Sequence, residues 1–250
     1  MSREMLNDTT WSSPEVTTAF PPAPRAMTYG GVAAKTGLFL LIIGGLAAVG
    51  WNSAATFTGR GSGLVYLVGF FVLIGLTIAS VNNPRLALAA GLLYSVLNGL
   101  WIGAISRYYE DVFDGIVGLA LLGTLAITVG MLILYSTRVF RVTARGAQII
   151  SALVLAIALM YFVAFLMSLF GADLNFLYGS SPAAILIGVV ILGVAASTLL
   201  VDFDFVEQGV KAGTPKAAEW YAAFGIVSSI VWIYLEVLRL LARIKVASNR

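Results

Sequence analysis

Three carboxylates, Asp202, Asp204 and Glu207, directly follow the uncharged stretch 174–201 and are the first candidates for chemistry. Ionisable groups within or at the end of such a stretch are costly to desolvate and commonly serve an ion or proton pathway. Asp202 and Asp204 are two positions apart, so on a helix they point about 200° apart and only one can face the interior. The alternative interpretation is a solvated boundary, in which Glu207 pairs with Lys211 one turn later.

The last apolar stretch, 217–244, supplies the other polar candidates. Ser228 and Ser229 fall near its middle, and Glu236 falls close to its far end. Arg239 follows Glu236 by three positions, so helical spacing predicts a salt bridge between them. The alternatives are an interfacial ion pair for Glu236, and serines that bond to their own helix or mediate helix packing.

The sequence lacks the residues on which most catalytic sites depend. It contains no cysteine and no histidine, which excludes thiolate chemistry, disulfides, histidine–metal sites and Ser-His-Asp triads. Its lysines stand at positions 35, 211, 216 and 245, at the ends of apolar stretches, so a mid-membrane lysine for retinal is missing. We therefore expect no enzyme and no cofactor, and calcium only as a transported ion that binds transiently at Asp202 and Asp204.

Composition indicates how these residues must be positioned. Hydrophobic residues make up 60% of the chain and charged residues 11%, against about 25% in soluble domains. Uncharged runs longer than the about 20 residues of a spanning helix recur along the chain. Their apolar character is continuous and does not alternate every second residue, which favours helices over the strands of a barrel.

We therefore predict an all-α, polytopic membrane protein with a seven-transmembrane helix bundle over residues 34–246. The spans are expected at about 36–57, 64–82, 86–106, 115–136, 146–170, 182–204 and 217–244. The proline-containing segment 1–33 is expected to be a disordered cytoplasmic tail. The seventh span carries the most charge, so a re-entrant segment is the alternative there.

The distribution of basic residues predicts the orientation. The loops on the side of the N-terminal tail hold most of the lysines and arginines, namely Arg3, Arg25, Lys35, Arg85, Arg138, Arg141, Arg145, Lys211 and Lys216. The opposite loops hold Arg60 and Arg107. The positive-inside rule then places the N-terminus in the cytoplasm of a plasma-membrane protein.

Several segments resemble one family. The run Met27–Gly37, followed by tight spans and then Val201-Asp202-Phe203-Asp204-Phe205-Val206, is similar to the bacterial branch of the Bax inhibitor-1 (transmembrane Bax inhibitor motif) family. Asp202 matches the aspartate at the end of the family's sixth span, and Asp204 matches it if the register slips by two. The threonine and glutamine that follow this aspartate in the family are absent here.

The resemblance implies a calcium leak channel gated by pH, in which two aspartates share a proton. Laying Leu238-Arg239 on the end of the family's last span puts Ser229 at the second aspartate, which is a departure from the pattern. Glu236, two turns away on the same face, or Asp204 is the candidate replacement. The implied gate therefore comprises Asp202, Asp204, Ser229 and Glu236.

Two functions of different class follow. The first is a cation leak pathway, with calcium as the expected ion and the acids as a proton-linked gate. The second is a non-transporting membrane regulator that binds other membrane proteins through its helices. Both require the lipid bilayer as a partner, neither involves nucleic acid, and both leave the oligomeric state open.

Overall fold

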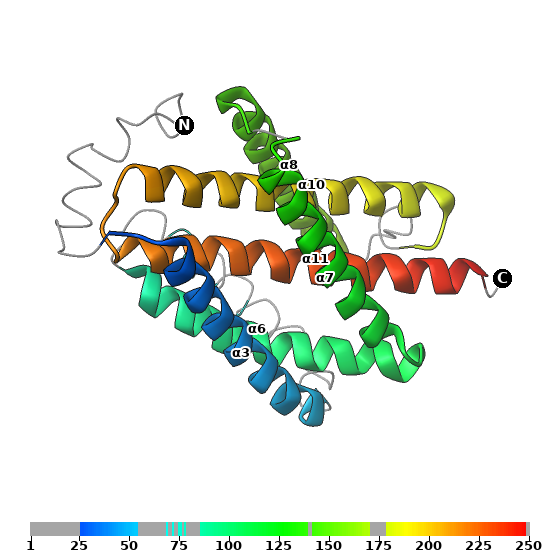
Figure 1. The fold of residues 1–250 in the computed structure, drawn as a ribbon. Coiled ribbons are helices and arrows are strands. Elements are labelled where there is room, and N and C mark those ends of the chain that lie inside the picture. The colour runs from blue at the N-terminus through cyan, green and yellow to red at the C-terminus, as the bar shows by residue number, and fades with distance from the viewer. Residues whose placement is uncertain are drawn as a thin grey trace. The chain divides into compact units, whose positions relative to one another are not determined.

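The computed structural model describes residues 26–54, 86–139, 142–170 and 179–248, together with positions 69, 72, 75, 76 and 78. Within this part of the chain six helices are long and apolar enough to cross a membrane. They are α3 (Tyr29–Asn52), α6 (Ala87–Val112), α7 (Ile116–Ser136), α8 (Ala144–Leu169), α10 (Pro182–Lys211) and α11 (Ala218–Ser248) (Figure 1).

The all-helical, multi-pass fold predicted from the sequence is confirmed. Six of the seven expected spans correspond to these helices. The remaining one, 64–82, lies outside the described residues except for the isolated positions. The count of seven crossings therefore stays a prediction.

Helix boundaries differ from those expected. The first helix begins at Tyr29. The expected end of the tail at residue 33 and the expected start of the first span at residue 36 are therefore both too late. The hydroxyl of Thr28 accepts a hydrogen bond from the Gly31 N–H at 3.0 Å and caps this helix. A capping threonine satisfies an otherwise orphaned amide, which moves the helix start ahead of the uncharged run.

The α10 helix also continues beyond its expected end at 204. Pro182 occupies its first turn, and Ser181 Oγ accepts a hydrogen bond from the Ala184 N–H at 3.2 Å. At the other end Gly213 adopts φ +65° and the Thr214 N–H bonds to the Gly209 carbonyl at 3.1 Å, which is a Schellman motif. The carboxylates at 202 and 204 therefore lie within the helix rather than at its C-terminus, where the helix dipole would oppose them.

The chain divides into two compact units, each with its own internal packing. One unit comprises Val112–Val201 and Ser229–Arg250, and thus contains α7, α8, the first part of α10 and the last part of α11. The other comprises Ser2–Asp111 and Asp202–Ser228, and contains α3, α6 and the remaining parts of α10 and α11.

In the unit that contains α3 and α6, aromatic contacts place α11 among the other helices. Tyr94 of α6 meets Phe224 edge-on with ring centroids 5.1 Å apart. Trp220 lies 5.7 Å from Phe39 of α3, centroid to centroid. Tyr221 lies 5.4 Å from Phe205 of α10, so this half of α11 contacts all three of its neighbours.

In the other unit the second half of α11 is equally central. Ser229 contacts α10, and Glu236 contacts α8. A Cβ built on Gly123 of α7 would lie 3.1 Å from Val237 Cγ1, so α7 also packs closely on α11. This helix is a single uninterrupted run of 31 residues, about 46 Å long, so it has no re-entrant break.

The outer surface of α8 is apolar. Its exposed side chains include Leu155, Leu159 and Val163, while Ala164 is buried. A helix with such a surface is expected in contact with lipid acyl chains rather than with water. This agrees with the bilayer as the environment of the protein.

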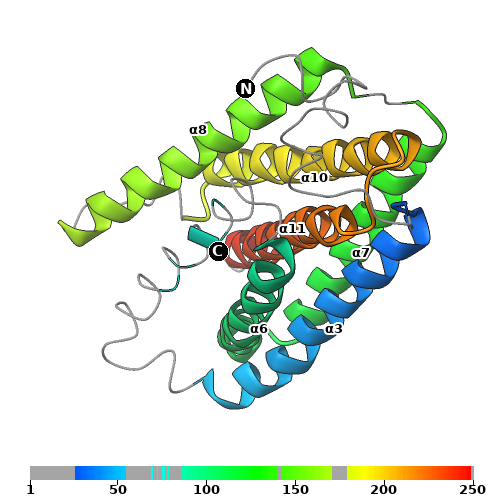
Figure 2. The same cartoon turned by 90° about the vertical axis from the view of Figure 1, so that its left-hand side faces the viewer.

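Glycines bring α3 and α6 into close contact, and the two helices lie side by side in both views (Figures 1 and 2). A Cβ on Gly103 would collide with the backbone carbonyl oxygen of Ala47. A Cβ on Gly99 would lie 2.9 Å from the carbonyl oxygen of Ile43. Gly99 and Gly103 are four positions apart, the spacing of small residues that allows membrane helices to approach closely.

We expect Gly103→Ala to destabilise the protein by about 1–3 kcal/mol, because the added methyl group forces two backbones apart. Thermal unfolding in detergent measures this. Gly44→Ala is the matched control, since nothing lies within 4 Å of its Cβ. The packing interpretation is wrong if both variants unfold at the wild-type temperature.

Candidate functional site

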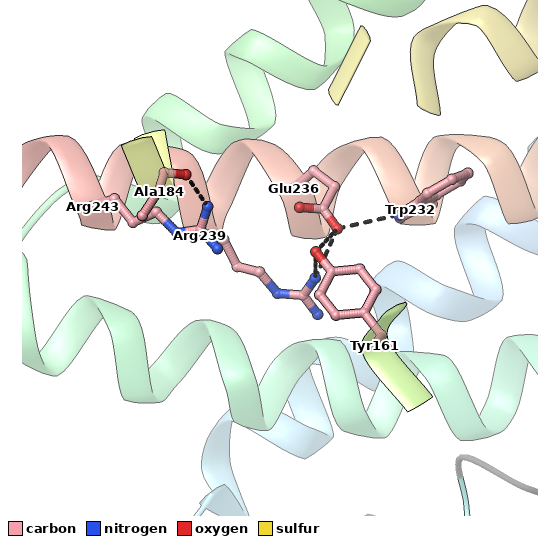
Figure 3. A network of polar contacts seen from close by, with 6 residues as sticks. All are labelled: Tyr161, Ala184, Trp232, Glu236, Arg239 and Arg243. Carbon is pink, nitrogen blue, oxygen red and sulfur yellow. Dashed lines mark hydrogen bonds and ion pairs between the residues drawn. The ribbon is translucent and has the colours of Figure 1, made fainter. Parts of the chain in front are cut away.

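Glu236 of α11 has a buried carboxylate, with a relative exposure of 1%. Three donors converge on its Oε1 (Figure 3): Arg239 Nη1 at 2.8 Å, Tyr161 Oη at 3.1 Å and Trp232 Nε1 at 3.2 Å. Arg239 also donates to the Tyr161 hydroxyl at 3.4 Å, and its guanidinium lies 5.4 Å from the tyrosine ring centroid. The carboxylate is thus matched by one cation and two neutral donors.

Two helices, α8 and α11, supply the residues of this cluster. Trp232, Glu236 and Arg239 follow one another at intervals of four and three on α11, so they share a face of that helix. Tyr161 comes from α8 and ties the two helices together. Inside a bilayer a charge is tolerated when such partners replace water.

Arg243 lies one turn beyond Arg239 and, unlike it, is buried. Its Nη1 donates to the Ala184 carbonyl at 2.9 Å, in the first turn of α10 (Figure 3). A Cβ on Gly188 would lie 2.7 Å from the same Nη1, so the glycine leaves room for the guanidinium. This contact fixes the end of α11 against the start of α10.

Ser229 and Thr198 join the middle of α11 to α10. The Thr198 hydroxyl donates to Ser229 Oγ at 2.9 Å, and Ser229 is buried. Ser228, its neighbour, donates back to the Phe224 carbonyl at 2.8 Å on its own helix. A serine at this position therefore makes a neutral interhelical hydrogen bond where the resemblance expects an aspartate.

In the unit that contains α3 and α6, Asp202 of α10 lies against α11. A Cβ built on Gly225 would come within 3.1 Å of Asp202 Oδ1, so the glycine provides the space in which the carboxylate sits. Asp204, two positions on, accepts a hydrogen bond from Gln208 of its own helix at 2.5 Å. The two aspartates therefore have different surroundings, as their angular separation on a helix predicts.

The candidate residues fall into two groups. Asp202 and Asp204 belong to the unit with α3 and α6, while Ser229, Glu236 and Arg239 belong to the unit with α7 and α8. Glu207 forms an ion pair with Lys211 one turn later. No group of three acidic, histidine or cysteine side chains within the described residues could hold a metal ion.

Sequence reasoning did not find two of the polar partners. Tyr161 stands in an apolar run, where no sequence pattern predicts a hydrogen-bond partner for its hydroxyl. Glu219 stands near the start of the last apolar stretch, where no local pattern distinguishes it, yet it is fully buried and paired with Lys35 of α3. Only the fold brings residues so distant in the chain together.

Comparisons with known proteins identify one family. The family model described as Bax inhibitor 1 like matches residues 4–246. No curated protein and no solved structure matches the chain. The family match covers nearly the whole sequence, and it confirms the resemblance drawn from the segments around Met27 and Asp202.

We expect Tyr161→Phe to lower the stability by about 1 kcal/mol, the order found for hydrogen bonds between membrane helices. The ring remains, but Glu236 loses one donor and Arg239 one acceptor. Denaturant unfolding in mixed micelles measures the loss. Tyr108→Phe is the control because that side chain is exposed, and equal losses in the two variants would contradict the assignment.

Proposed function

This chain belongs to the Bax inhibitor 1 like family, and on that premise we propose that it provides a proton-sensitive leak pathway for cations, with calcium as the principal ion. The observation that carries the proposal is the presence of buried or half-buried carboxylates on two long apolar helices, α10 and α11. Carboxylates in such positions are costly to desolvate, and they commonly serve an ion or proton pathway.

Asp202 and Asp204 are assigned the gate. Carboxylate oxygens are the ligands that Ca²⁺ prefers, and protonation removes the charge that attracts the ion. The close approach of Asp202 Oδ1 to Gly225 supports a defined position for this carboxylate, since a Cβ there would lie 3.1 Å from Oδ1 and the carboxylate would have to shift. Ser229 and Glu236 are the polar candidates of the other unit, where Arg239 forms an ion pair with Glu236.

Glu236 is the acid least exposed to solvent among these candidates, and its partners suit a different role. The Arg239 cation compensates its charge, and Tyr161 and Trp232 donate to it. We assign it the fixed, paired acid of the pathway. Asp202 and Asp204 are proposed as the groups whose protonation changes with pH, because they occupy the positions at which the family resemblance implies the gate.

Calcium flux into proteoliposomes, measured against pH, tests the gate. We expect Asp202→Asn and Asp204→Asn each to reduce the pH dependence and to hold the flux near the level of the protonated protein, because asparagine is neutral at every pH. The matched control is Glu207→Gln, which removes the charge of an acid paired with Lys211 one turn away.

Identical pH profiles in the wild type and both asparagine variants would contradict the gating role of Asp202 and Asp204. Absence of any flux in the wild type, together with other membrane proteins that co-purify with it, would favour the second function, a non-transporting membrane regulator.

The topology that we propose has seven crossings with the N-terminus in the cytoplasm and the C-terminus outside. A cysteine introduced at Ser248 tests it, because the chain has no native cysteine. An impermeant thiol reagent is expected to label Ser248→Cys on intact cells. Labelling that requires permeabilised cells would place the C-terminus inside and contradict the arrangement.

A further inference from the structure

The segment just before α3, Ala26–Thr28, is attached to the turn between α10 and α11, residues 212–217. The Met27 N–H donates to the Thr214 carbonyl at 2.7 Å, and Ala26 pairs with Pro215 in an antiparallel bridge. Met27 and Thr214 are each only 2% exposed. We call this segment the strap and its contacts with the turn the clasp.

A buried charge pair secures the strap. Glu219, in the first turn of α11, is fully buried and forms an ion pair with Lys35 of α3. Its Oε1 accepts from the Thr28 N–H at 3.0 Å and from the Thr28 hydroxyl at 3.1 Å. One carboxylate therefore holds both the last residue of the strap and the second turn of α3.

The surroundings are shaped for this carboxylate. A Cβ on Gly31 would collide with the Glu219 carboxyl group, so only glycine leaves the space. Lys35 Nζ also lies 4.9 Å from the centroid of the Trp220 ring, a cation–π contact that keeps the ammonium beside α11. Charge, space and aromatic contact converge on the same few residues.

The clasp also has a weak side. The Thr214 hydroxyl is buried and makes no hydrogen bond within the described part of the chain. The strap itself contributes one main-chain hydrogen bond, one bridge and the contacts of Thr28. Segments held by so few bonds open locally more readily than a helix core, and removal of the Glu219 charge pair removes most of what holds this one.

We propose that the clasp is a regulatory restraint: the strap holds the α10–α11 turn in place, and release of the strap increases the cation leak. The turn ends the same helix that carries Asp202 and Asp204, so freeing the turn frees the last turns of α10. The effect on the leak rests on the proposed function, whereas the opening of the clasp is a separate property that can be measured without flux.

Thiol labelling measures the opening. In the full-length protein in detergent, Thr214→Cys gives a single buried thiol, because the chain has no other cysteine. We expect Lys35→Met and Glu219→Gln, each combined with Thr214→Cys, to be labelled by a maleimide about tenfold faster, which corresponds to about 1.4 kcal/mol in the opening equilibrium. Lys211→Met, which breaks the exposed pair with Glu207, is the control and should not change the rate.

Calcium flux in proteoliposomes measures the consequence. We expect Lys35→Met and Glu219→Gln to raise the flux severalfold over the wild type. The double variant Ala26→Cys with Pro215→Cys locks the clasp, since opposed residues of an antiparallel pair lie within disulfide distance. Oxidised, this variant is expected to suppress the increase caused by Lys35→Met, and reduction should restore it.

The outcomes separate the two levels. Unchanged labelling in both charge variants overturns the clasp, and the disulfide variant still reports on closure if one charge variant fails to fold. If the charge variants are labelled faster but their calcium flux equals that of the wild type, the clasp does not control the leak. A wild type without flux refutes the proposed function, while the labelling rates still decide whether the clasp opens as inferred.

Discussion

The structure depends on one constraint: the charges that α11 carries through the membrane must be paired there. A bilayer offers no water to these groups, so each needs a partner from the protein. Glu219 pairs with Lys35, Glu236 with Arg239, and Arg243 donates to a backbone carbonyl. These contacts, together with aromatic packing, hold the neighbouring helices around α11 in each unit.

Glycines make this pairing possible. Gly31 leaves space for the Glu219 carboxylate, Gly188 for the Arg243 guanidinium, and Gly225 for Asp202. A Cβ at these positions would collide with Glu219 Oε1 and would lie 2.7 Å from Arg243 Nη1 and 3.1 Å from Asp202 Oδ1, so each charged group would have to shift. The glycines of α3 and α6 act differently, since they let two backbones touch. Small residues thus serve charge placement in some parts of the protein and helix approach in another.

The acidic residues of α10 and α11 have different surroundings. Glu219 and Glu236 each face a cation and further donors, which suits a fixed structural charge. Asp204 interacts with the neutral Gln208, and Asp202 lies against Gly225. Proton sensitivity is proposed for the aspartates of α10, and a structural role for the paired acids of α11.

The sequence by itself determined what depends on composition and on neighbours along the chain. The length of the uncharged runs predicts the helices. A spacing of three or four residues puts both members of a pair on one face of a helix, and so predicts the ion pairs Glu236–Arg239 and Glu207–Lys211. It placed the start of α3 too late because the Thr28 cap precedes the uncharged run. Helix ends depend on caps and turns that hydropathy does not register.

Only the tertiary structure decided which distant residues meet. Glu219 and Lys35 are 184 positions apart, and Tyr161 and Glu236 are 75 apart. No local period encodes such a pair, because its geometry follows from how helices pack. The sequence shows the carboxylates at positions 202, 204 and 207 as residues, but it does not show their surroundings. The clasp at Glu219 followed from the fold alone, since a lone charge near a helix start has no signature of burial.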